Sequence, residues 1–239
     1  MNTETRIRES FAVQAQWCEK LGSPFTAQLL DGLGAGLDHT TESGHRILTW
    51  QGPPDALGDA VALRLAGALH GVARRGDHPD LTRLYPPNPL PDTETLVRVA
   101  LETIRNADAD IMRWLDHPPQ TNEVARSAIL YPGLMRIAAE TGLTLSLYEI
   151  GCSAGLNLIP DRYADRLGGV KAGQADSTVV LTPDWSGAAA GGPDPEIVSR
   201  RGCDRNVLDV TDDAHAERIV SYVWPDQPER MNRITAALD

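Results

Sequence analysis

The segment LTLSLYEIGCSAGLN, residues 143–157, constrains the fold more than any other part of the chain. Leucine alternates with polar or aromatic residues over LTLSLY, which is the period of a β-strand. The strand leads directly into Gly151 and Gly155, and the following LNLIPDRYADRL is predicted to be a helix. A strand, a glycine-rich turn and a helix in this order indicate an α/β unit.

The residues before this segment are predicted to be mainly helical. In DAVALRLAGALHGVARRG, apolar residues recur on one helical face and Gly76 is expected to end the helix. TETLVRVALETIRNADADIMRWL has the pattern of a second long amphipathic helix. In TNEVARSAILYPGLMRIAAETG, Pro132 is expected to kink or break a third helix before it stops near Gly142. HRILTW is the only modest strand candidate in this part of the chain.

The residues after the turn predict further strands. STVVLTPDW is expected to be a strand, and EIVSRRGCDRNVLDVTD a strand that ends in a polar turn. TDDAHAERI has acidic residues ahead of a helical pattern, and PDQPERMNRITAALD predicts a closing helix.

Composition excludes several classes of function. A net charge of -11 argues against sequence-independent nucleic-acid binding, which depends on Lys and Arg. The amino terminus lacks a signal-peptide pattern and no apolar run is long enough to span a bilayer, so we expect a cytoplasmic protein without a membrane partner. The three cysteines and six histidines form no C-x-x-C, H-x-H or H-E-x-x-H pattern, so we expect no metal.

The glycine turn satisfies two different functional motifs. GCSAG has the form G-x-S-x-G, in which Ser153 would be the nucleophile of a serine hydrolase. That fold needs several strands before the serine, and an acid and a histidine after it. Here the preceding chain is largely helical and His215 is the only later histidine, so the hydrolase is the less favoured interpretation.

The nucleotide-loop interpretation uses more of the residues. Gly151 and Gly155 let a ligand approach the main chain, and Glu149 would lie at the carboxyl end of the strand. The pattern is E-x-G-x-x-x-G-x-N rather than the G-x-G-x-x-G of dinucleotide sites. An acid there would repel a pyrophosphate but could accept hydrogen bonds from the ammonium group of an amino-acid-like cofactor. This chemistry favours S-adenosylmethionine over NAD.

YEIGCSAGLN resembles the first motif of the class I, Rossmann-like S-adenosylmethionine-dependent methyltransferases, an acidic residue followed by G-x-G-x-G. Glu149, Gly151 and Gly155 match, and Ser153 stands at the middle glycine. RWLDHPPQTNEVARSAILYPGL, RRGCDRNVLDVTD and YVWPDQPERMNRITAAL are, with the loop, similar to an uncharacterised bacterial family, domain of unknown function 2332. That resemblance implies a helical region ahead of a methyltransferase-like sheet, and further strands beyond residue 239.

Four polar residues outside the glycines are further candidates. In PPQTNE, one interpretation is that Thr121 or Asn122 caps a helix and Glu123 suits the positive end of its dipole. The other, which the methyltransferase resemblance implies, is that Asn122 and Glu123 cover the cofactor or substrate. Asn157 caps a helix or contacts the ligand. Asp204, after a later strand, is a candidate for binding ribose hydroxyls.

We therefore predict an α/β protein with a helical subdomain over residues 1–141 and a Rossmann-like, incomplete parallel sheet over residues 142–239, truncated at its carboxyl end. The predicted function is that of an S-adenosylmethionine-dependent methyltransferase-like protein with a small-molecule substrate, without an assigned catalytic base or oligomeric state. The alternatives are a non-catalytic or degenerate nucleoside-binding scaffold and the serine hydrolase. The predicted cofactor-binding residues are Glu149, Gly151, Ser153, Gly155, Asn157 and Asp204.

Overall fold

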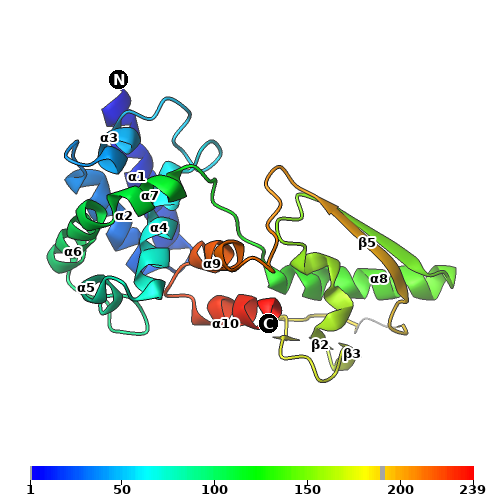
Figure 1. Ribbon diagram of the computed structural model, residues 1–239. Coiled ribbons are helices and arrows are strands. Elements are labelled where there is room, and N and C mark those ends of the chain that lie inside the picture. Colours follow the sequence, from blue (N-terminus) through cyan, green and yellow to red (C-terminus); the bar gives the residue numbers. More distant parts are fainter. Residues whose placement is uncertain (1, 189–191) are drawn as a thin grey trace. The chain divides into compact units, whose positions relative to one another are not determined.

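The computed structural model describes residues 2–188 and 192–239 (Figure 1). They form two compact units. The first runs to Gln120 and adds Glu217–Pro228, and the second contains Thr121–Ala216 and Glu229–Asp239. The protein is of mixed α/β type with a small parallel sheet. The domain boundary between residues 141 and 142 stays a prediction.

The first unit is helical and has one continuous apolar core. Its complete helices are α1 (Thr3–Lys20), α2 (Pro24–Gly36), α3 (Glu42–Leu48), α4 (Val61–Arg75), α5 (Pro79–Thr82), α6 (Thr93–Asn106) and α7 (Asp108–Leu115). The predicted apolar face of α4 is confirmed, since Leu65 and Leu69 are wholly buried in this core. Gly76 ends α4 with a φ of 77°, a conformation that costs glycine little.

Two sequence predictions for the first unit were wrong. HRILTW is not a strand, because most of it lies in α3, where the Thr41 hydroxyl accepts the Gly44 N–H at 3.0 Å and caps the helix. The long helix expected over TETLVRVALETIRNADADIMRWL is divided at Ala107 into α6 and α7. At this break the Asp108 carboxylate accepts the N–H groups of Glu42 and Ser43, a contact between segments that helical periodicity does not reveal.

In the second unit, a single turn of 3-10 helix, η1 (Val124–Arg126), precedes α8 (Ser127–Thr141). A kink or a break was expected at Pro132. The break is wrong, because α8 continues through Pro132 to Thr141, and the kink stays a prediction. The predicted stop is confirmed: Gly142 caps the helix with a φ of 66°.

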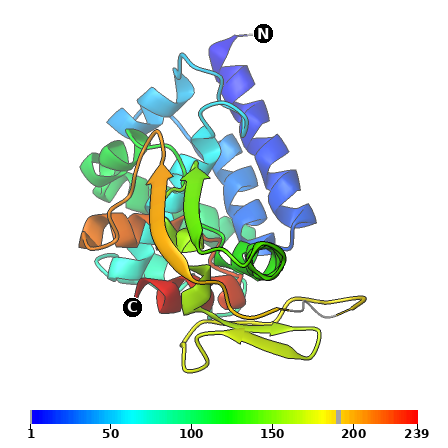
Figure 2. The same ribbon diagram turned by 90° about the vertical axis from the view of Figure 1, so that its right-hand side faces the viewer.

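The predicted strand before the glycine turn is confirmed. It is β1 (Leu145–Ile150), and it pairs in parallel with β5 (Ile197–Cys203), so the strand expected in EIVSRRGCDRNVLDVTD is also confirmed. Figure 2 shows the two strands side by side, with their carboxyl ends at the same edge. Tyr148 and Ile150 of β1 are 71% and 90% exposed, although parallel strands are usually covered on both faces.

The helix predicted after the glycine turn was wrong. The chain instead forms two 3-10 turns, η2 (Leu156–Leu158) and η3 (Pro160–Arg162), because Pro160 has no N–H for a continuing α-helix. A second sheet follows, in the order β3–β2–β4, with β2 (Ala164–Leu167), β3 (Val170–Gly173) and β4 (Val180–Leu181). Thus only two residues of STVVLTPDW form the expected strand.

The chain closes with α9 (Asp213–Ser221) and α10 (Pro228–Leu238), and both predicted helices are confirmed. No helix within residues 2–188 and 192–239 combines the length and the apolar character that crossing a membrane requires.

Candidate ligand-binding site

Two carboxylates lie at the carboxyl ends of the parallel strands. Glu149 of β1 pairs with Gly202 of β5, and Asp204 follows directly after the last paired residue, Cys203. Strand pairing therefore brings to one edge two acids that are far apart in the sequence. Open α/β sheets bind their ligands at this edge.

The loop after β1 is a compact turn with alternating left-handed residues. Gly151, Ser153 and Gly155 have φ values of 73°, 51° and 75°. The left-handed backbone at Gly151 and Gly155 confirms the predicted need for glycine at these two positions. Ser153 adopts the same conformation, which is uncommon for residues other than glycine. The N–H groups of Gly151 and Cys152 both donate to the Cys203 carbonyl, at 2.8 and 3.2 Å, so the turn is bonded to the end of β5.

Asp204 holds the loop in this conformation. Its Oδ2 accepts the Ser153 N–H and its Oδ1 accepts the Asn206 N–H, both at 2.9 Å. These two bonds hold the pKa of Asp204 below its usual value, and the bond from Asn206 has the larger effect. The carboxylate predicted to bind ribose therefore lies beside the loop as expected, and each of its oxygens accepts a backbone hydrogen bond. Ribose binding stays a prediction.

Glu149 has one carboxylate oxygen that lacks a hydrogen-bond partner among the described residues. Its Oε2 is buried and accepts no hydrogen bond from any described residue. Burial raises the pKa of Glu149, the positive charge of Arg126 lowers it, and the negative charge of Asp204 raises it again. A buried oxygen without a partner costs free energy, which a hydrogen-bond donor at this position would recover.

Two buried asparagines join the loop to the segment before α8. Asn122 accepts the N–H of Leu156 at 3.0 Å through Oδ1, so it caps the residue after Gly155 rather than its own helix. The Ser127 hydroxyl donates to Oδ1 of Asn157 at 2.9 Å, while Nδ2 of Asn157 has no described partner. The structure thus brings Asn122 to the predicted loop, and binding of a ligand by Asn122 or Asn157 stays a prediction.

Glu123 is occupied by other protein groups. Its carboxylate accepts the N–H of Ala125 at 3.2 Å and caps η1, so the cap is Glu123 itself rather than Thr121 or Asn122. It also forms ion pairs with Arg230 and Arg233 of α10, at 2.8 and 3.3 Å. Glu123 thereby ties the amino end of η1 to the last helix, and its contact with a substrate stays a prediction.

Sequence reasoning missed Arg126. This residue lies between Asn122 and Ser127, both bonded to the loop, and its charge acts on Glu149. Its side chain is exposed and forms no ion pair with any residue of the described ranges. A lone cation in a short polar segment next to predicted site residues was the available signal.

The structure does not assemble the hydrolase pair. Oγ of Ser153 is buried and has no hydrogen-bond partner among the described residues. Nδ1 of His215 accepts the N–H of Asp209 at 3.2 Å. A serine nucleophile needs a hydrogen bond to its general base, and Ser153 makes none to His215.

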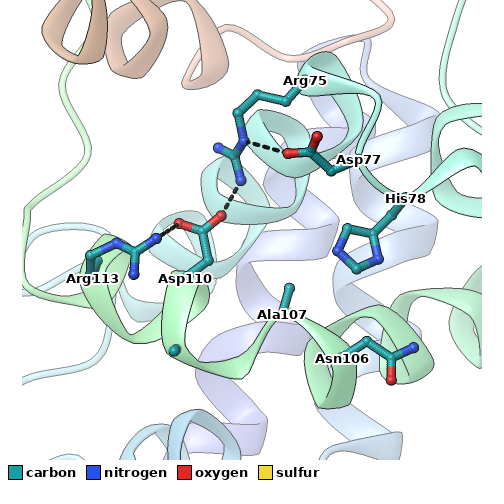
Figure 3. A pocket seen from close by; sticks show the side chains of 8 residues that line it. Arg75, Asp77, His78, Asn106, Ala107, Asp110 and Arg113 are labelled. Atoms are coloured by element: carbon teal, nitrogen blue, oxygen red, sulfur yellow. Dashed lines mark hydrogen bonds and ion pairs between the residues drawn. The ribbon is translucent and has the colours of Figure 1, made fainter.

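The first unit carries a separate surface hollow of about 560 Å³ near the end of α4 (Figure 3). Arg75 contacts both Asp77 and Asp110, and Asp110 also pairs with Arg113 at 2.7 Å. These two arginines and two aspartates compensate one another, so a charged ligand would gain little there. In the part of the chain that the structure describes, no three His, Cys, Asp or Glu side chains are placed to hold a metal ion.

Comparison with known proteins identifies the family alone. No curated protein and no solved structure matches the chain. Residues 8–239 match the family described as an uncharacterised protein conserved in bacteria, DUF2332. The match covers the helices of the first unit as well as the glycine loop and β5, and the chain therefore belongs to the DUF2332 family.

Proposed function

We propose that the edge formed by Glu149, the Gly151–Gly155 loop and Asp204 binds S-adenosylmethionine, and that the protein is a methyltransferase-like protein with a small-molecule acceptor. The observation that carries the proposal is the buried Oε2 of Glu149, which has no described partner. A cationic donor there, such as the ammonium group of the cofactor, would supply the missing hydrogen bond and offset the repulsion between the two acids.

The hydrogen bonds that the loop N–H groups already make within the protein favour S-adenosylmethionine over a dinucleotide. A pyrophosphate needs free N–H groups and the amino end of a helix. Here the N–H groups of Gly151, Cys152, Ser153 and Gly155 all donate to protein acceptors. A three-residue 3-10 turn takes the place of the helix. Two carboxylates at this edge would further repel phosphate.

The parallel pairing of β1 and β5 also supports a Rossmann-like interpretation. The acid and the glycine turn stand at the end of one strand, and the second acid stands at the end of its neighbour. In Rossmann-like folds, acids at adjacent strand ends bind the polar groups of a nucleoside ligand. Many methyl transfers depend mainly on alignment of donor and acceptor, so no catalytic base needs to be assigned.

Calorimetric titration with S-adenosylhomocysteine tests the proposal. We expect micromolar binding, on the order of 8 kcal/mol, and no heat with NAD. Glu149→Gln removes the charge while keeping the shape, and should weaken binding about tenfold or more. Glu140→Gln is the matched control, because Glu140 is an exposed residue of α8 that pairs only with Arg136 among the described residues. No binding by a chain shown by circular dichroism to be folded contradicts the proposal.

A second measurement separates the methyltransferase from the non-catalytic scaffold. With saturating S-adenosylmethionine and a panel of small-molecule acceptors, a methyltransferase releases S-adenosylhomocysteine faster than in the acceptor-free reaction. Binding of the cofactor without such release for any acceptor supports the scaffold.

A further inference from the structure

The segment before α8 lies against the glycine loop at two fixed points. Asn122 accepts the N–H of Leu156, and Ser127 donates to Asn157, with Asn122, Ser127 and Asn157 all buried. Arg126 directly precedes the second of these contacts, so its backbone position relative to the loop is determined by buried hydrogen bonds.

The acidic residue Glu123 and the basic residue Arg126 of this segment differ in their partners. Glu123 is paired with Arg230 and Arg233 and also caps η1. Arg126 forms no ion pair and no hydrogen bond through its guanidinium with residues 2–188 or 192–239. The carboxylate of Glu123 is therefore occupied by protein partners, whereas the guanidinium of Arg126 is available to a ligand.

Arg126 and Glu149 are complementary but do not contact each other. The charge of Arg126 lowers the pKa of Glu149, which places the groups within electrostatic range, yet no hydrogen bond or ion pair joins them. Because Arg126 and Glu149 are not paired with each other, each can bind the opposite charge of a ligand that carries both signs. The ammonium and carboxylate of an α-amino acid have this arrangement on a single carbon.

We infer that Arg126 binds the carboxylate of a ligand whose ammonium group is held by Glu149, so that this site selects ligands with an α-amino-acid group. The inference rests on the proposed function and specifies which end of the ligand lies beside α8. Arginine suits this role because its planar guanidinium donates two parallel hydrogen bonds to a carboxylate. Arg126 is thus a specificity-determining residue, and a nucleoside without the amino acid would not use it.

The test compares two ligands that differ in the amino-acid group. S-adenosylhomocysteine carries it, whereas 5′-methylthioadenosine keeps the nucleoside and the thioether but has neither ammonium nor carboxylate. Both are titrated calorimetrically into the wild-type chain and the Arg126→Gln variant. The matched control is Arg136→Gln, because Arg136 is an exposed arginine of the adjoining helix α8 and pairs with Glu140.

We expect Arg126→Gln to weaken S-adenosylhomocysteine binding about tenfold or more and to leave methylthioadenosine binding unchanged. Arg136→Gln should change neither. If Arg126→Gln leaves both affinities unchanged, or weakens both equally, the inference is wrong while the proposed function survives. If the folded wild-type chain binds neither ligand, the proposed function fails and the inference fails with it.

Discussion

Ser153 donates its backbone N–H to Oδ2 of Asp204 at 2.9 Å, across 51 positions of the sequence. This bond joins the turn after β1 to the turn after β5. Since Ser153 has a φ of 51°, the carboxylate stabilises a backbone conformation that serine alone would disfavour. The shape of the candidate site therefore depends on a residue that follows the neighbouring strand of the parallel sheet.

Replacement of Asp204 should weaken the hydrogen bonds between the two turns and lower the stability of the protein. Asp204→Asn keeps a carbonyl oxygen for one amide but removes the charge and one acceptor, so we expect a loss of about 1–2 kcal/mol in the free energy of unfolding. Urea unfolding followed by circular dichroism measures it. Asp176→Asn, at an exposed position, is the control and should change stability by less than about 0.5 kcal/mol. Equal effects from both variants would show that Asp204 does not hold the loop.

The left-handed conformation at position 153 predicts opposite effects for two substitutions. Ser153→Gly relieves the backbone strain and removes a buried hydroxyl without a described partner, so it should keep or raise stability, by up to about 1 kcal/mol. Ser153→Val places a β-branched side chain at this φ and should cost roughly 2 kcal/mol. Thermal unfolding distinguishes them. A valine variant as stable as the wild type would mean that the loop does not require this conformation.

Asn122→Ala should expose the loop to local opening. Leu156 would lose the acceptor of its buried N–H, at a cost of about 1–3 kcal/mol. Hydrogen–deuterium exchange should therefore accelerate in a peptide that contains Leu156, without a similar change in α8. Thr121→Ala alters the exposed neighbouring residue and serves as the control. Unchanged exchange of Leu156 in the Asn122 variant would contradict the assigned contact.

Asp165 of β2 should make stability depend on pH. Its side chain is wholly buried, neither carboxylate oxygen has a described partner, and burial raises its pKa from 3.8 to about 7. Arg166 opposes this rise and Asp194 reinforces it. Because the folded state holds the proton more tightly than the unfolded state, the wild type should lose stability as pH rises from about 4 to about 7.

Asp165→Asn removes this titration. Relative to the wild type, the variant should gain roughly 2 kcal/mol of stability between pH 5 and pH 8. Urea unfolding at several pH values in this range measures the difference, with Asp176→Asn as the control. A constant difference across the range would show that Asp165 titrates as an ordinary surface carboxyl.

Local patterns predicted the elements whose formation depends on neighbouring residues. The alternation in LTLSLY identified β1, the apolar face of α4 identified a core helix, and Gly76 and Gly142 marked helix ends. They failed where another segment intervened, as at Ala107, where the chain turns so that Asp108 bonds α3. Pro160 is a local signal as well, since a 3-10 turn begins at it in place of the expected helix.

The sequence by itself determined the glycine turn, the acid before it and the strand that leads into it, because the φ preferences of glycine and the period of a strand are local properties. Only the tertiary structure decided that Asp204 and Asn122 bond the turn, that Glu123 pairs with arginines of α10, and that Arg126 forms no ion pair with a described residue. Hydrogen bonds between distant segments, and the lack of a partner for Oε2 of Glu149 among the described residues, depend on which strands pair and what surrounds them. The spacing of residues in the sequence does not determine which strands pair or which side chains surround a group.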